Sequence, residues 1–139
     1  MTKTFRLAFL IFLISNPLVA KSNYFEEGIT LFVNKKFEEA KFKFEQDIVF
    51  NPKSEISYLY LSKIFRNLEN KGLEEQNLNT VILLNPRNEE ATFNLAKLKL
   101  ESSDYIKSKE LNNRLSSFCN KYCGKSKKLK VEIENLLKK

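Results

Sequence analysis

The sequence IVFNP at residues 48–52 is followed 34 residues later by the similar sequence ILLNP at residues 82–86. In both places an apolar stretch of helical spacing runs into Asn-Pro. Asn before Pro disfavours further α-helix, and Pro cannot continue one. A large apolar residue, Phe44 or Leu78, stands eight residues before each proline, and Tyr105 stands two such periods after Phe37. A fixed period of this length indicates a repeat protein.

Between these markers the apolar residues are spaced as on one face of an α-helix. One such series is Phe25, Ile29 and Phe32. Polar breaks at residues 34–36, 67–72 and 102–103 divide each period into two helices. The pattern therefore predicts an all-α chain built from helix pairs.

A period of 34 with two helices and a terminal proline resembles the tetratricopeptide repeat family. With Lys21 as repeat position one, the first two copies fill hallmark positions of that family with Tyr24, Gly28, Phe37, Ala40, Phe44, Pro52 and Pro86. At these positions Gly28 and Ala40 allow close helix approach, and Phe37 and Phe44 fill the space between the helices. The resemblance implies a right-handed α-solenoid of about three repeats, with the bounds 21–54, 55–88 and 89–122.

Two acidic residues depart from the family pattern. Asp47 and Glu74 stand where small side chains are expected, and Ser108 does so in the third copy. Because an unpaired buried carboxylate is costly, either acid must reach solvent or a partner. We therefore expect the second helix of repeat two to be shifted or loosely packed. The alternative is an unrelated helical bundle with accidental spacing, which the paired Asn-Pro sites disfavour.

Residues 123–139 follow the repeats and predict one more amphipathic helix. Its apolar face carries Leu129, Ile133, Leu136 and Leu137, and Lys and Glu occupy the other face. Solenoids need a terminal element that covers the last apolar surface and presents a polar back to water. We expect this helix to be that cap.

The first 20 residues differ from the rest of the chain. Lys3 and Arg6 precede an unbroken apolar run at 7–14, and a break at 15–17 leads to Ala20. This is the plan of a secretory signal peptide cleaved after Ala20. An uncleaved membrane anchor is the alternative, but the run is far shorter than the ~20 residues that span a bilayer. We expect an exported bacterial protein, in the periplasm, with no stable membrane anchor after cleavage.

The composition narrows the chemistry. The 139 residues include no His, so the commonest general base and most zinc sites are excluded. The net charge of +7 falls to +5 without residues 1–20, since Lys3 and Arg6 leave with them, and it is spread along the chain. Neither a Gly-rich phosphate loop nor the aromatic-basic pattern of a single-strand binder is present. We expect no enzyme activity, metal, cofactor or nucleic-acid partner.

Cys119 and Cys123 are the two cysteines. Haem attachment needs a His after the second Cys, and two thiols alone lack the ligands for a metal site. In an oxidising exported compartment the default is a disulfide, here one that ties the third repeat to the cap.

Tetratricopeptide proteins typically bind partner peptides or helices on the concave face made by the first helix of each repeat. The resemblance places the following residues on that face: Phe25, Ile29, Phe32, Val33, Leu59, Lys63, Arg66, Asn67, Phe93, Lys97 and Leu100. Lys63 and Lys97 are one period apart, and such a pair attracts a carboxylate. The alternative is an ordinary solvated lysine-rich surface. The family's carboxylate-clamp subgroup requires Lys and Asn where this chain has Phe25, Ile29 and Leu59, so a strict clamp is not expected.

These features favour a non-catalytic adaptor of the bacterial envelope that binds another protein or peptide segment, acidic in character, or a second copy of itself. The alternative is a regulatory or assembly subunit of an envelope enzyme system, for peptidoglycan or cytochrome maturation.

Overall fold

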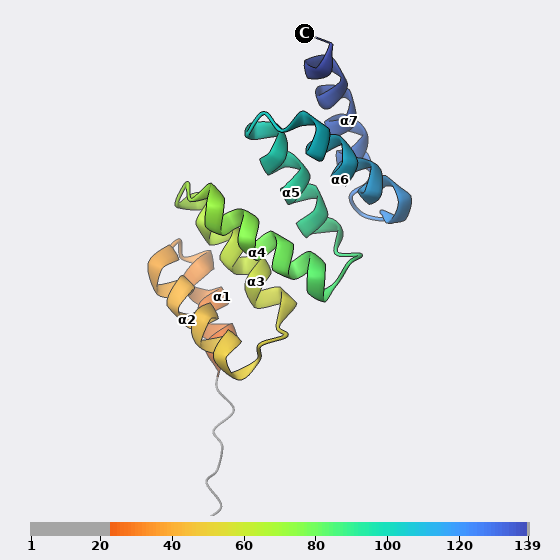
Figure 1. Ribbon diagram of the computed structural model, residues 1–139. Coiled ribbons are helices and arrows are strands. Elements are labelled where there is room, and N and C mark those ends of the chain that lie inside the picture. Colours follow the sequence, from red (N-terminus) through yellow and green to blue (C-terminus); the bar gives the residue numbers. More distant parts are fainter. Residues whose placement is uncertain (1–22, 139) are drawn as a thin grey trace, which may run out of the picture.

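The computed structural model describes residues 23–138, which form seven α-helices and no strand. The helices are α1 (Tyr24–Val33), α2 (Phe37–Phe50), α3 (Glu55–Asn67), α4 (Lys71–Leu84), α5 (Glu89–Glu101), α6 (Tyr105–Phe118) and α7 (Cys123–Leu137). The first six pair into three hairpins that follow one another in chain order, and α7 packs on α5 and α6 (Figure 1). The predicted all-α solenoid is confirmed, and the predicted signal peptide at 1–20 lies outside the described residues.

The turn inside each hairpin repeats with the same period as the sequence. Lys35, Glu69 and Ser103 follow α1, α3 and α5, stand 34 residues apart, and have φ values of 59°, 56° and 62°. This left-handed conformation ends a helix abruptly and normally favours glycine. Each first helix thus ends by the same device, with three different side chains.

The second helices of repeats one and two end at the Asn-Pro sites. Asn51 and Asn85 are the C-terminal caps of α2 and α4, and their backbone N–H groups donate to the backbone carbonyl oxygens of Asp47 and Val81. The proline that follows has no N–H to continue the helix. In the third repeat Cys119 occupies the same cap position, and it forms a disulfide with Cys123.

The hallmark residues of the first repeat lie where the helices cross. Ala40 and Phe44 are fully buried, and Gly28 is buried under the Phe44 ring. Tyr24 stacks on Phe50 at 5.7 Å between ring centres, and Phe37 meets Phe32 edge-on. Gly28, Ala40 and Phe44 are therefore packed between the helices of the first hairpin.

The two departures from the family pattern are both buried, and both have partners. Asp47 accepts hydrogen bonds from Ser57 Oγ at 2.5 Å and Asn51 Nδ2 at 2.9 Å. Glu74 pairs with Arg66 of α3 at 3.1 Å. The expected loosening of the second helix of repeat two is wrong, because these partners satisfy the acids, and Leu78 and Val81 of α4 are fully buried.

The terminal helix α7 covers the end of the core. Leu129 and Ile133 are buried in the cluster that also holds residues of α5 and α6, whereas Leu137 is 44% exposed. The sulfurs of Cys119 and Cys123 lie at bonding distance, with their Cα atoms 5.3 Å apart, so α6 is tied to α7 as predicted. None of the helices within residues 23–138 has the length and the apolar character of a membrane span.

Candidate partner-binding surface

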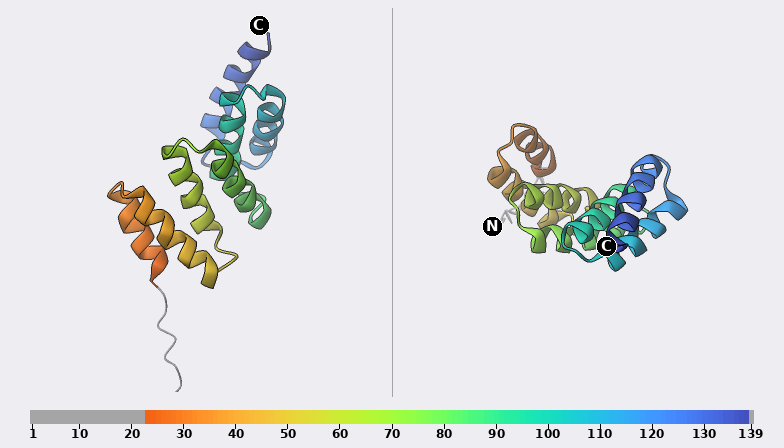
Figure 2. Two further views of the ribbon diagram at one scale, coloured as in Figure 1. Left: turned by 60° about the vertical axis from the view of Figure 1, so that its left-hand side comes forward. Right: turned by 90° about the horizontal axis from the view of Figure 1, so that it is seen from above.

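Side-chain contacts join α1, α3, α5 and α7 in sequence, and we call their shared surface the first-helix face. Tyr60 of α3 meets two phenylalanine rings of α1, and Lys63 of α3 pairs with Glu90 of α5 at 2.8 Å. Phe93 of α5 meets Tyr122, the residue before α7, at 5.5 Å between ring centres. The hairpins follow one another in a curved row (Figure 2).

The N-terminal half of the first-helix face is aromatic. Phe25 and Phe32 contact the Tyr60 ring edge-on, with centres 6.1 Å and 5.2 Å apart, and Tyr60 stacks on buried Phe44 at 5.0 Å. Phe25, Ile29, Phe32 and Tyr60 are all half-buried. They therefore complete the core and still show an apolar edge to solvent. Tyr60 was missed in the sequence, and its place one helical turn before Lys63 is the signal that could have found it.

Two residues predicted for this face lie inside the protein instead. Leu59 and Leu100 are only 4% and 7% exposed, and both belong to the core cluster that includes Leu78 and Leu95. They are packing residues, because the sides of α3 and α5 that carry them face the interior. Val33, in contrast, is 72% exposed at the end of α1.

The predicted basic stretch is ion-paired within the fold. Lys63 pairs with Glu90, and Arg66 Nη2 lies 2.7 Å from Glu101 in addition to its contact with Glu74. Lys97 lies 3.7 Å from the same Glu101 carboxylate, and Asn67 donates its amide to the Lys63 carbonyl. The charge that these residues offer to an outside anion is accordingly reduced.

Burial raises the pKa of Glu74, and the nearby Glu101 carboxylate raises it further against the opposing effect of Arg66. Arg66 thus holds two carboxylates from α4 and α5, and this network links three helices. The ion pairs of Arg66 therefore serve first to hold α3, α4 and α5 together.

The C-terminal half of the face holds a pocket of about 210 Å³ between α5 and α7. We call it the cap pocket, and its lining residues are Phe93, Lys97, Lys125, Lys128, Leu129 and Glu132. The Lys125 ammonium lies 4.2 Å from the centre of the Tyr122 ring and 5.6 Å from that of Phe93. Phe93 and Lys97 were predicted for the face; the lysines of α7 were interpreted only as the polar back of a cap.

Glu89 holds the approach to α7 in place. Its two carboxylate oxygens accept the backbone N–H groups of Asn120 at 2.8 Å and Tyr122 at 2.7 Å. These hydrogen bonds, that from Tyr122 above all, lower the pKa of Glu89. The first residue of α5 therefore positions the loop that carries both the disulfide and Tyr122.

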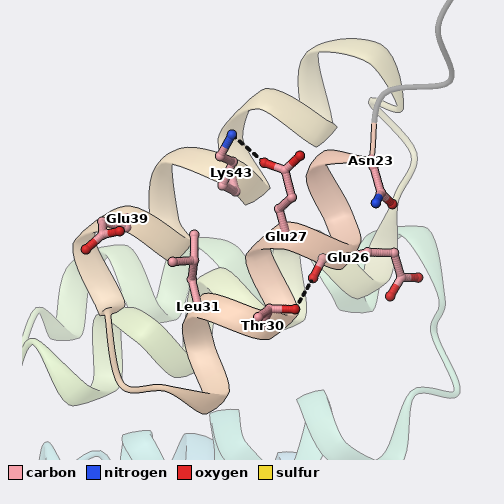
Figure 3. A pocket seen from close by; sticks show the side chains of 7 residues that line it. All are labelled: Asn23, Glu26, Glu27, Thr30, Leu31, Glu39 and Lys43. Carbon is pink, nitrogen blue, oxygen red and sulfur yellow. Dashed lines mark hydrogen bonds and ion pairs between the residues drawn. The ribbon is translucent and has the colours of Figure 1, made fainter.

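A second pocket, of about 460 Å³, lies between α1 and α2 at the N-terminal end (Figure 3). Its lining residues are Asn23, Glu26, Glu27, Thr30, Leu31, Glu39 and Lys43. Glu27 pairs with Lys43, and Thr30 Oγ donates to the Glu26 carbonyl at 3.0 Å. At 100° per residue, Glu27 and Thr30 lie on the side of α1 that faces away from the aromatic half of the first-helix face.

The described residues hold no cluster of three or more His, Cys, Asp or Glu side chains placed to bind a metal. The ionisable side chains around the pockets are lysines and glutamates, several already paired with each other. This chemistry suits recognition by charge and apolar contact.

Solved structures with a similar fold share the architecture of this chain. No model of a known family matches the sequence, and no curated protein matches it. Among solved structures, the first tetratricopeptide domain of Spaghetti (RPAP3), bound to the HSP90 peptide SRMEEVD, is similar with a TM-score of 0.75 at 15% identity, covering 84% of this chain and 91% of that one.

Two further solved structures show the same likeness. The TPR2B domain of yeast Sti1, in a complex with pHsp70, gives a TM-score of 0.75 at 14% identity over 81% of this chain and 94% of that one. The Yersinia enterocolitica type III secretion chaperone SycD, in complex with a peptide of the translocator YopD, gives a TM-score of 0.73 at 13% identity. The match covers 82% of this chain and 89% of that one. With its 34-residue helix pairs and its hallmark residues in place, the chain has the tetratricopeptide-repeat fold.

Proposed function

We propose that this protein is a non-catalytic interaction module that binds a segment of a partner protein on the first-helix face. The observation that carries the proposal is the row of half-buried apolar side chains, Phe25, Ile29, Phe32 and Tyr60, which keeps an edge exposed on a single face. Aromatic residues are enriched at interfaces because they provide large contact area at low entropic cost.

Two of the similar solved structures support a peptide-sized partner. One holds an HSP90 peptide and another a peptide of the translocator YopD. We place the interaction in the bacterial envelope, because residues 1–20 have the plan of a secretory signal. The partner's identity decides between an adaptor and a regulatory or assembly subunit of an envelope enzyme system.

The test is capture of partners from envelope extract by the immobilised protein, with two matched double variants. Val33 and Asn67 are exposed on first helices one period apart, and Val49 and Leu83 are exposed on second helices one period apart. We expect Val33→Glu with Asn67→Glu to lose a saturable partner that Val49→Glu with Leu83→Glu retains. Loss only in the second variant would contradict the proposal, and capture of nothing but the protein itself would replace it with self-association.

A further inference from the structure

The cap pocket differs from the rest of the first-helix face in how its positive charges are used. Of its three lysines, Lys97 lies within ion-pair distance of a carboxylate, that of Glu101. Within residues 23–138, neither Lys125 nor Lys128 has a carboxylate within 4.0 Å. Glu132 is the acidic side chain in the lining, so the pocket keeps a net positive charge.

The ammonium of Lys125 lies over two aromatic rings. These are the rings of Tyr122 and Phe93, which contact each other. A cation over an aromatic ring is attracted by the ring quadrupole, yet it keeps its full charge because the ring has none to neutralise it. The ammonium therefore lies over the rings without a carboxylate partner among residues 23–138, and it can still bind a carboxylate of a ligand.

The floor of the pocket is apolar. Leu129 is 4% exposed and packs in the core, and Phe93 is half-buried beside it. A volume of about 210 Å³ lies below the roughly 300–1,000 Å³ of sites for drug-sized ligands. It therefore suits one apolar side chain with neighbouring charged groups.

We propose that the cap pocket binds an acidic segment of the partner protein, with an apolar side chain on Phe93 and Leu129 and flanking carboxylates at Lys125 and Lys128. This inference rests on the proposed function and names the chemistry of the partner. It makes α7 part of the binding surface as well as the cap of the core. Charge complementarity favours this occupant, since the lysines at the pocket outnumber its carboxylate.

The test uses the purified chain and a fluorescein-labelled peptide, GDDFDD, with GNNFNN as its uncharged counterpart. Fluorescence anisotropy at low salt measures affinity. We expect Lys125→Gln with Lys128→Gln to weaken binding of GDDFDD by about 10-fold or more, since the variant loses two charge-assisted contacts. The matched control is Lys127→Gln with Lys130→Gln, which removes two exposed lysines of α7 outside the pocket and should change affinity by less than about 2-fold. Circular dichroism verifies that both variants fold.

Equal weakening in the two double variants, or equal affinity for GDDFDD and GNNFNN, would overturn the inference. So would binding to phosphatidylglycerol vesicles with none to GDDFDD, which would assign the lysines to a membrane surface. If the peptide fails while the Val33/Asn67 variant still loses its captured partner, the inference fails alone and the proposed function stands.

Discussion

Gly28 of α1 lies directly under the ring of Phe44 of α2, so closely that a Cβ atom at position 28 would come within 2.9 Å of Phe44 Cε1. The ring cannot easily move away, because Phe44 is fully buried and contacts both Phe25 and Tyr60. This contact sets the distance between the helices of the first hairpin and supports the aromatic half of the first-helix face.

Gly28→Ala should therefore lower the free energy of unfolding by about 1–3 kcal/mol, because overpacking outweighs the higher helix propensity of Ala. Urea denaturation followed by circular dichroism measures the change. Gly72→Ala is the control: a Cβ there meets Asn70 Oδ1 at an ordinary 3.8 Å, so stability should be unchanged or rise by up to about 1 kcal/mol. Equal effects of the two substitutions would contradict the close contact.

Glu69 ends α3 in a left-handed conformation that most side chains adopt at a cost of roughly 1–2 kcal/mol. Glu69→Gly should relieve this strain and raise the free energy of unfolding by about 0.5–1 kcal/mol, whereas Glu69→Ala should not. Chemical denaturation of the two variants decides the point. A loss of stability in the glycine variant would show that the side chain, and not the backbone, stabilises this turn.

Arg66 compensates the buried carboxylate of Glu74. Arg66→Met should lower the free energy of unfolding by about 1–2 kcal/mol at neutral pH, because it leaves the buried Glu74 carboxylate without its partner. The loss is moderate because Arg66 is partly exposed and solvent screens the ion pair. Adding Glu74→Gln should recover much of the loss, because the uncompensated charge is then gone. A double variant whose loss in free energy of unfolding equals the sum of the losses in the two single variants would exclude this coupling.

The pH dependence of the same variant follows from the raised pKa of Glu74. A carboxyl group whose pKa is higher in the folded than in the unfolded state favours folding when protonated, and this contribution is lost as pH rises through the folded pKa. Arg66→Met removes a group that lowers this pKa. Its stability deficit relative to the wild type should therefore shrink when pH is lowered from neutral into the mildly acidic range.

Glu89 should give the opposite pH dependence. Its pKa lies below the ordinary value of 4.5 because it accepts backbone hydrogen bonds, so its contribution is present above that value and is lost as pH falls through the folded pKa. Glu89→Gln should be less stable than the wild type at pH 7, and the difference should disappear in acid. The control is Glu110→Gln, an exposed glutamate paired with Lys107. A deficit that persists unchanged in acid would show that charge on Glu89 is not what matters.

Much of the fold was predictable because its determinants are local. The Asn-Pro caps, Gly28 and the helical spacing each act within one helix or one hairpin, so the sequence shows them directly. The predicted loosening of α4 around Glu74 was wrong. Arg66, which compensates the charge of Glu74, lies on the other helix of the hairpin, so the residues of α4 alone do not reveal it.

The candidate site was less predictable because repeat position indicates a face but not a partner. Lys63 and Arg66 were expected to be available, yet each pairs with a carboxylate of α5, 27 and 35 residues further along the chain, and Arg66 pairs with Glu74 of α4 as well. Lys125 became part of the site only once α7 packed beside α5 and placed its ammonium over Phe93 and Tyr122.

The most direct measurement of the central claim is site-specific photocrosslinking in cells. A photoreactive amino acid replaces Asn67 on the first-helix face or, as the matched position, Asn79 on α4; both are exposed asparagines. We predict a discrete adduct with another protein from position 67 and none from position 79. Adducts from position 79 alone, or none from position 67, would contradict binding on the first-helix face.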